Sequence, residues 1–292
     1  MNKEKILQAG KIAVQVREFI KPQIKKGIPL LEIAEKIENK IIELGGKPAF
    51  PTNLGIDNIT AHSTPSYNDE TKAQGLLKID YGVHIDGWTS DTAFSMDLEN
   101  SEENKKLIEA SEKALENAIK KMKDGIFASE IGKTISETIE QENFSPVRNL
   151  AGHQMEKYEL HAGISIPNVN DKKNIQIKKG LYAIEPFATN GSGKVHDGKS
   201  SEIYMVIDSK NVRSPIAREI LNFVLEEYQT LPFCSRWLVK KFGTKALIGL
   251  SQLTQNRNLH RFPQLVEEPN TKVAQSEHTI LLEKNEVIVT TQ

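Results

Sequence analysis

The residues best suited to chemistry are acids that end apolar strands. The segment from Gly75 to Asp80 is a glycine, a mostly apolar run and a terminal carboxylate, and the segment from Gly180 to Glu185 repeats this pattern. A carboxylate buried at a strand end needs a cation to offset its lost hydration. Two such strands in one chain predict a cleft in which acids converge on divalent metal ions.

A β-hairpin is expected to bring two of these acids together. Asp86-Gly87 is a two-residue turn signal between the segments 76–85 and 88–96. With this turn, Asp80 lies opposite Ala93, two residues beyond Asp91. The two acids therefore share one face as diagonal neighbours, roughly 7–8 Å apart at the backbone, within reach of a common ion. The alternative, two acids that only face water, stays open because the turn could slip in register.

Three histidines are candidates for ligation or substrate contact. His62, His153 and His161 each stand beside alanine or glycine, which permit close approach of a ligand. Neutral imidazole is a common ligand of borderline divalent metals. The usual role of a single histidine is solvated or packed, and we expect it for His84, His196, His260 and His278.

The elements that position these residues also repeat. The pattern Gly27-Ile28 followed by an isoleucine stripe over 33–41 returns at Gly125-Ile126 and over 131–139. Two related halves predict two similar units around a pseudo-two-fold axis. We expect helices over 4–21 and from Pro29 to Gly45, a helix pair over 105–142, strands near 181–188 and 201–207, and a final hairpin of 278–282 and 286–291 with its turn at Lys284-Asn285.

Residues 210–262 interrupt the repeat. Helical patterns over 214–228 and 235–242 flank a turn at Leu231–Phe233, and the stretch leans basic. We predict a small, winged-helix-like insertion subdomain at 209–262. The catalytic domain is then formed by residues 1–208 and 263–292.

Composition excludes several classes of protein. The 292 residues carry a net charge of −1, so no broad basic field favours bulk or specific DNA binding. No apolar run approaches the ~18 residues that span a bilayer, and the N-terminal segment lacks the apolar core of a secretory signal. Cys234 is the only cysteine, which excludes a thiolate cluster and fits a reducing cytoplasm. Any metal is therefore held by oxygen and imidazole.

Together these segments resemble the methionine aminopeptidases, which are pita-bread metallopeptidases. The basic insertion is similar to the helical subdomain of the type 2 branch, in its short archaeal form. The resemblance implies an α+β pita-bread fold with internal pseudo-symmetry. It follows the family's order across almost the whole chain, in residues 49–53, 61–65, 78–87, 90–94, 149–153, 161–168, 183–187 and 275–282.

The resemblance also implies a dinuclear metal site. Its five ligands would be Asp80, Asp91, His153, Glu185 and Glu277, with Asp91 and Glu277 bridging two ions. Four carboxylates and two divalent cations make a nearly neutral site. Oxygen-rich ligation suits Co, Mn, Fe or Zn, and the sequence does not choose among them.

The same resemblance assigns roles in peptide hydrolysis. A metal-activated hydroxide would attack the first peptide carbonyl, with Glu185 as proton shuttle. His161 would stabilise the carbonyl oxygen and His62 would position the scissile bond. With these histidines, Phe50, Leu160 and Phe262 would line a pocket for the methionine side chain, because a thioether packs well on aromatic rings. For Phe262 a plain core role is nearly as strong an alternative.

The expected substrate is the N-terminus of a nascent polypeptide with methionine first and a small residue second. The ribosome is a candidate partner, no membrane is expected, and a monomer is the family expectation. Two alternatives stay open. One is a prolidase or aminopeptidase P, which have an additional N-terminal domain. The other is a non-catalytic relative that binds RNA, ribosomes or protein partners.

Overall fold

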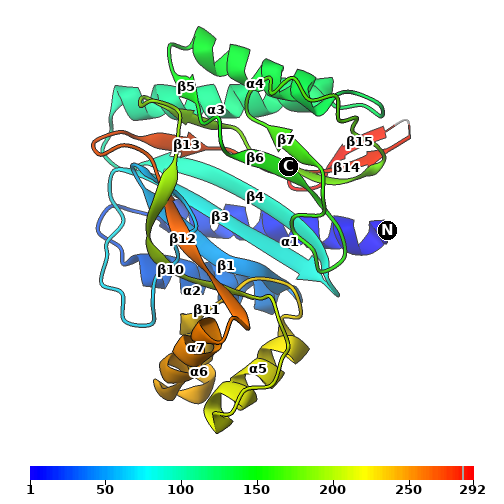
Figure 1. Ribbon diagram of the computed structural model, residues 1–292. Coiled ribbons are helices and arrows are strands. Elements are labelled where there is room, and N and C mark those ends of the chain that lie inside the picture. The colour runs from blue at the N-terminus through cyan, green and yellow to red at the C-terminus, as the bar shows by residue number, and fades with distance from the viewer. Residues whose placement is uncertain (285) are drawn as a thin grey trace.

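The computed structural model describes residues 1–284 and 286–292 as two α/β units with a helical insertion (Figure 1). The helices are α1 (Lys3–Ile20), α2 (Leu30–Glu43), α3 (Glu102–Lys121), α4 (Ala128–Gln141), α5 (Pro215–Glu227), α6 (Ser235–Phe242) and α7 (Lys245–Gln255). The strands are β1 (Lys47–Ile56), β2 (Ile59–Ala61), β3 (Leu76–Ile85), β4 (Trp88–Asp97), β5 (Ser145–Pro146), β6 (Ala151–Met155), β7 (Ser165–Pro167), β8 (Gly180–Ile184), β9 (Phe187–Thr189), β10 (His196–Val206), β11 (Phe233–Cys234), β12 (Leu259–Val266), β13 (Val273–Gln275), β14 (His278–Glu283) and β15 (Glu286–Val289).

The first unit packs α1 and α2 against the antiparallel sheet β1-β3-β4. The isoleucine stripe of α2 is fully buried there, because residues three and four apart share one helix face. Pro29 precedes the first turn of α2, where its fixed φ and missing N–H are tolerated. The two helices expected at the start of the chain are therefore confirmed.

The second unit repeats this plan with α3 and α4 against the sheet β15-β14-β8-β6-β7. Gly27 and Gly125 occupy equivalent positions before α2 and α4. Both have positive φ values, of 90° and 82°, and the N–H of each donates to a backbone carbonyl at 2.8 Å. Only glycine adopts this conformation without strain, which explains its recurrence at the matching place. The pseudo-symmetric fold expected from the sequence is confirmed.

Both predicted hairpins are present. In the first, Asp80 pairs with Ala93 and Gly82 pairs with Asp91, so the predicted register is correct. In the second, β14 pairs with β15 and also with β8. The structure ends β15 at Val289, two residues before the expected end, and Asn285 of the predicted turn lies outside the described residues.

The insertion has a core of its own, formed by α5, α6 and α7 (Figure 1). It leaves the second unit after β10 and returns through β12, which pairs with β10 and β2. The boundary expected after residue 262 falls inside β12. This strand therefore belongs partly to each side of that division.

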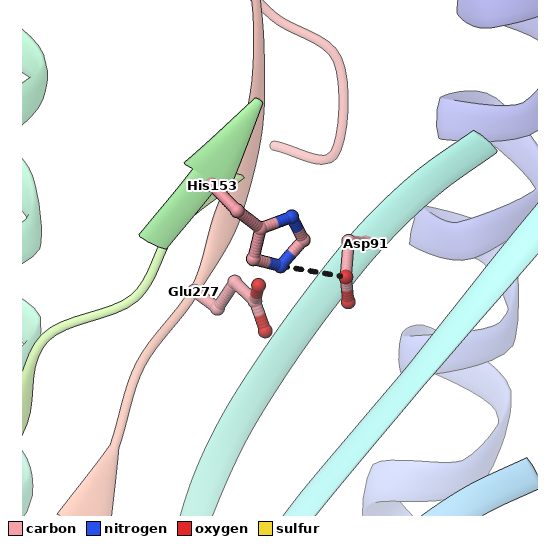
Figure 2. A group of neighbouring side chains, drawn as sticks. All are labelled: Asp91, His153 and Glu277. Carbon is pink, nitrogen blue, oxygen red and sulfur yellow. Dashed lines mark ion pairs between the residues drawn. The ribbon is translucent and has the colours of Figure 1, made fainter. Parts of the chain in front are cut away.

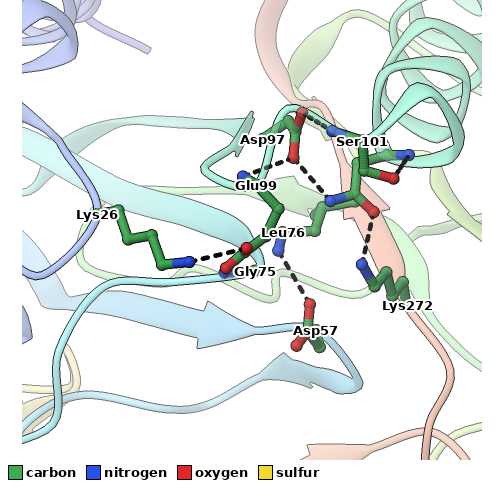
Figure 3. Close-up of polar contacts among 9 residues, drawn as sticks. Lys26, Asp57, Gly75, Leu76, Asp97, Glu99, Ser101 and Lys272 are labelled. Carbon is green, nitrogen blue, oxygen red and sulfur yellow. Dashed lines mark hydrogen bonds and ion pairs between the residues drawn. The ribbon is translucent and has the colours of Figure 1, made fainter.

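Polar contacts fix the base of the first hairpin to the start of α3 (Figure 3). The Asp97 carboxylate accepts hydrogen bonds from the backbone N–H groups of Glu99 and Ser101. Lys26 pairs with Glu99 at 2.9 Å, and the Leu76 N–H donates to Asp57 at 2.9 Å. These contacts hold β3, the strand that carries Asp80, at Leu76, which is its first residue.

Membrane insertion is not indicated by the helices. Within the described residues, each helix is too short or too polar to cross a bilayer.

Candidate metal centre and substrate cavity

Three strands place acids in one row across the junction of the two units. Asp80 on β3 pairs with Ala93 on β4, and Ala93 forms an antiparallel bridge with Glu277, just before β14. Paired residues of neighbouring strands point to the same face of a sheet. Asp80 and Glu277 therefore flank Ala93 on one face, and Asp91, two residues before Ala93, joins them.

The second unit supplies its ligand candidates by the same geometry. His153 on β6 pairs with Ala183 on β8, and Glu185 follows Ala183 by two residues. His153 and Glu185 are therefore diagonal neighbours on one face, as Asp80 and Asp91 are in the first unit. The carboxylate-ended strands singled out by the repeat thus face each other.

These side chains are close enough to share metal ions. Ligand atoms of Asp91, His153 and Glu277 all lie within 4.8 Å of one another (Figure 2). The Nε2 atom of His153 lies 3.7 Å from Asp91 Oδ2 and 3.8 Å from Glu185 Oε1. In Figure 2 the imidazole of His153 on β6 and the carboxylates of Asp91 on β4 and Glu277, just before β14, converge on one point.

Burial makes this cluster unfavourable without a cation. Loss of hydration raises the pKa of Asp80 to about 7, although the Gln275 side chain opposes the shift. Burial and then the neighbouring carboxylates raise the pKa values of Asp91, Glu185 and Glu277 well above the usual range. Burial lowers the pKa of His153 to about 3, so its imidazole is neutral and available as a ligand.

The donor set fits divalent metal ions. Oδ1 of Asp80 and Oδ1 of Asp91 are buried and lack a hydrogen-bond partner among the described residues. Buried polar atoms are nearly always paired, so these two oxygen atoms are suited to binding a cation. Carboxylate oxygens with one imidazole suit Mn, Fe, Co or Zn.

A cavity of about 890 Å³ opens onto the cluster. Its lining includes all ten residues singled out in the sequence, namely Phe50, His62, Asp80, Asp91, His153, Leu160, His161, Glu185, Phe262 and Glu277. The structure therefore brings the predicted ligands, histidines and apolar side chains into one space. Their individual roles remain predictions.

His62 and His161, which are not among the predicted ligands, each pack against another ring of the cavity lining. The ring of His62 meets Phe262 edge-on at 5.2 Å between centroids, and the ring of His161 meets His153 at 4.2 Å. Burial lowers the pKa of His62 to about 4 and also lowers that of His161. Both imidazoles are therefore neutral near pH 7, so each can donate one hydrogen bond and accept another.

Part of the cavity wall escaped the sequence analysis. Tyr158 and the insertion residues Gln229, Thr230 and Pro232 also line the cavity. The Thr230 hydroxyl donates to the Tyr158 carbonyl, which ties the insertion to the loop before His161. No periodic pattern marks these residues. The turn predicted at Leu231–Phe233 was the only signal that the chain bends here.

Gly152, beside His153, leaves no room for a side chain. A Cβ atom there would lie 2.3 Å from the Ala183 carbonyl oxygen on the neighbouring strand. Because backbone must shift, Gly152→Ala is expected to lower the free energy of unfolding by ~1–3 kcal/mol, measured by urea denaturation. Gly198→Ala is the control, since its Cβ would meet a movable Val266 side chain at 3.1 Å. Equal stability of the two variants would contradict the close approach.

Comparisons with known proteins agree with this geometry. Residues 4–226 match metallopeptidase family M24, so the chain belongs to that family. Within it, the chain is similar to a methionine aminopeptidase of Methanocaldococcus jannaschii. The two are 46% identical over 99% of this chain and 98% of the relative.

Solved structures show the same fold at low sequence identity. A thermophilic Arx1 has a TM-score of 0.84 at 15% identity and covers 99% of this chain and 91% of its own. A methionine aminopeptidase of Thermotoga maritima has a TM-score of 0.71 at 21% identity and covers 100% of this chain and 98% of its own. At these identities the likeness supports the fold alone.

Proposed function

We propose that this chain is a methionine aminopeptidase that removes the N-terminal methionine of polypeptides whose second residue is small. The observation that carries the proposal is the buried cluster of Asp91, His153 and Glu277 at the cavity. The 46% identity to an archaeal enzyme of that name supports it over nearly the full length.

The metal centre we propose is dinuclear. Asp80, Asp91, His153, Glu185 and Glu277 would hold two divalent ions, since four acids around one imidazole leave a large excess of negative charge. When bound, such ions lower the pKa of a water molecule and polarise a carbonyl group. The choice among Co, Mn, Fe and Zn is a matter for metal analysis of the purified protein.

Glu185 is suited to moving the proton of the hydrolysis. It lies beside His153 at the cavity, where water and the peptide would meet. The carboxylate would take the proton of the attacking water and deliver it to the nitrogen of the leaving amine. One side chain would thus serve both halves of the bond cleavage, and the proton count balances.

His161 is suited to stabilising the negative charge that develops on the scissile carbonyl oxygen. Because its imidazole is neutral, the ring can donate an N–H hydrogen bond to that oxygen. His161→Ala is expected to lower kcat by about 10²-fold while bound metal, measured by elemental analysis, stays constant. Unchanged turnover at constant metal content would sink this role.

The apolar wall would select the first side chain. Phe50 and Leu160 belong to one buried cluster, and Phe262, which also lines the cavity, packs against the ring of His62. An unbranched thioether can follow such an irregular aromatic surface. His62, directly after β2, would contact the backbone at the scissile bond and leave little room for a bulky second residue.

The direct test is methionine release from Met-Gly-Met in the presence of each candidate metal. Release that requires metal and is absent with Ala-Pro substrates would support the methionine aminopeptidase assignment. Preference for Ala-Pro would favour a prolidase-like enzyme. No release from folded, metal-loaded protein would favour a non-catalytic binding role.

The proposed substrates are nascent chains, so we place the enzyme in the cytoplasm, at the ribosome. We also propose that it is a monomer. Basic side chains on α6 support a ribosome contact, although Lys241 also stacks on the Phe223 ring at 4.4 Å. Lys240→Gln is therefore the cleaner variant. It is expected to reduce co-sedimentation with ribosomes at low salt, and undiminished co-sedimentation would exclude this surface.

The proposed division of the chain keeps 1–208 and 263–292 as the catalytic domain and 209–262 as the insertion. The separate core of α5–α7 supports it. Limited proteolysis should cut first in the mostly exposed segment 207–213 that enters the insertion, whereas the boundary inside the paired strand β12 should resist cleavage. Early cuts within α5–α7 would contradict the division.

A further inference from the structure

A buried ion pair joins the insertion to the first unit, outside the cavity. Arg236 on α6 pairs with Glu38 on α2, and both side chains are almost fully buried, at 4% and 7% exposure. The Trp237 indole N–H donates to the second Glu38 oxygen at 2.7 Å. Neither charged residue lines the cavity, so the pair has no direct part in the chemistry proposed above.

The pair also forms hydrogen bonds to two segments that carry cavity residues, namely residues 50–54 and 62–65. Oε1 of Glu38 accepts a hydrogen bond from the Thr52 N–H at 3.2 Å, two residues after Phe50. The Arg236 guanidinium donates to the Thr64 hydroxyl at 3.2 Å and to the Pro65 carbonyl. These acceptors lie two and three residues after His62 in the chain. One buried pair therefore contacts the backbone beside both an apolar wall residue and a cavity histidine.

Segments 50–54 and 62–65 depend on these hydrogen bonds because their backbones are irregular. His62 has φ of 56°, a left-handed conformation that is unfavourable for most residues other than glycine. Between Phe50 and Asn53 the pairing of β1 with β3 shifts register, so regular ladder bonds are interrupted there. The Leu54 N–H donates to the Ser63 carbonyl at 2.6 Å, which links the two segments to each other. Irregular backbone of this kind keeps one geometry only when its surroundings hold it.

We propose that Arg236 and Glu38 are positioning residues that fix Phe50 and His62, so that the insertion sets the shape of the methionine pocket. The inference rests on the proposed function, because it concerns how that pocket binds its substrate. If Arg236 were neutralised, the buried Glu38 carboxylate would be left unpaired. The two segments would then shift to solvate it.

The test is Arg236→Gln in the full-length protein. KM for Met-Gly-Met is expected to rise about tenfold or more, and kcat is expected to fall by a smaller factor because the reacting acids lie on other strands while His62 shifts. The Kd of free L-methionine, measured by calorimetry, is expected to rise in parallel. Arg236→Lys keeps the charge but loses the forked donor geometry and should recover part of the binding.

Lys47→Gln is the matched control. Lys47 pairs with Glu227 at 2.7 Å and also joins the first unit to the insertion, through α5. The Lys47 ammonium group makes no hydrogen bond to segment 50–54 or segment 62–65, so KM and Kd should stay at wild-type values. A folded Arg236→Gln protein with wild-type KM and Kd, altered only in melting temperature, would reduce the pair to a structural link.

A milder variant keeps the proposal testable if Arg236→Gln does not fold. Trp237→Phe removes the indole donor to Glu38 and keeps aromatic packing against Tyr228. It should weaken methionine binding in the same direction, and no change would overturn the proposal. If wild-type protein binds methionine but releases none from peptides, the proposed function fails while the Kd values still test the pair.

Discussion

Glu185→Gln is expected to lower kcat for Met-Gly-Met by about 10³-fold. The amide is nearly isosteric with the carboxylate, so the side chain still fits beside His153, but it cannot accept and return a proton. Burial, and then the charges of Asp91 and Asp80, raise the pKa of Glu185 well above its usual range. The measurement is steady-state kinetics at matched, directly determined metal content.

The control for this variant is Glu156→Gln, which removes an exposed carboxylate three residues after His153. Its turnover should be that of the wild type. If Glu185→Gln retains metal and more than about a tenth of the wild-type kcat, proton transfer must be assigned to another group.

Asp91→Asn is expected to abolish the stabilisation that divalent metal gives the wild-type protein. A ligand present at roughly 1,000 times its Kd adds about 4 kcal/mol to the free energy of unfolding. Asp91 Oδ2 lies 3.7 Å from His153 Nε2, and a ligand atom of Asp91 lies within 4.8 Å of one of Glu277. Its loss should therefore weaken metal binding below the level at which melting temperature responds.

Without metal, Asp91→Asn should lose no stability relative to the wild-type protein. Burial, and then the charge of Asp80, make an ionised Asp91 unfavourable in the fold. Metal-free Asp91→Asn should therefore be at least as stable as metal-free wild type. Glu137→Gln, on the exposed face of α4, is the control for loss of an acid elsewhere. A large metal-dependent rise in the melting temperature of Asp91→Asn would contradict this assignment.

Local patterns in the sequence predicted much of this arrangement. The Asp86-Gly87 turn fixed the register that sets Asp80 diagonal to Asp91, because a two-residue turn leaves one pairing for the whole hairpin. The repeated glycines and isoleucine stripes predicted the two units. These signals act over a few residues, and the structure preserves them.

What could not be predicted depends on contacts between distant segments. The alignment of Ala93 with Glu277 links β4 to the end of the chain, and no pattern near either residue encodes it. The pairing of Glu38 with Arg236 is similarly distant, across α2 and the insertion. The family resemblance supplied Glu277 as a candidate ligand, whereas the ion pair had no signal in the sequence.

The position of Glu277 has a consequence for the order in which the enzyme matures. Its partners in the cluster are translated well before it, and it enters the sheet only by pairing with Ala93 and through β14 beside β8. The neighbouring His278 is held in turn by the Thr291 hydroxyl, one residue from the end of the chain. A chain still under synthesis therefore holds an incomplete, mutually repelling set of acids. The complete metal-binding set is assembled only after β14 has paired with β8, so tight metal binding should follow the docking of this strand and not the folding of the first unit alone.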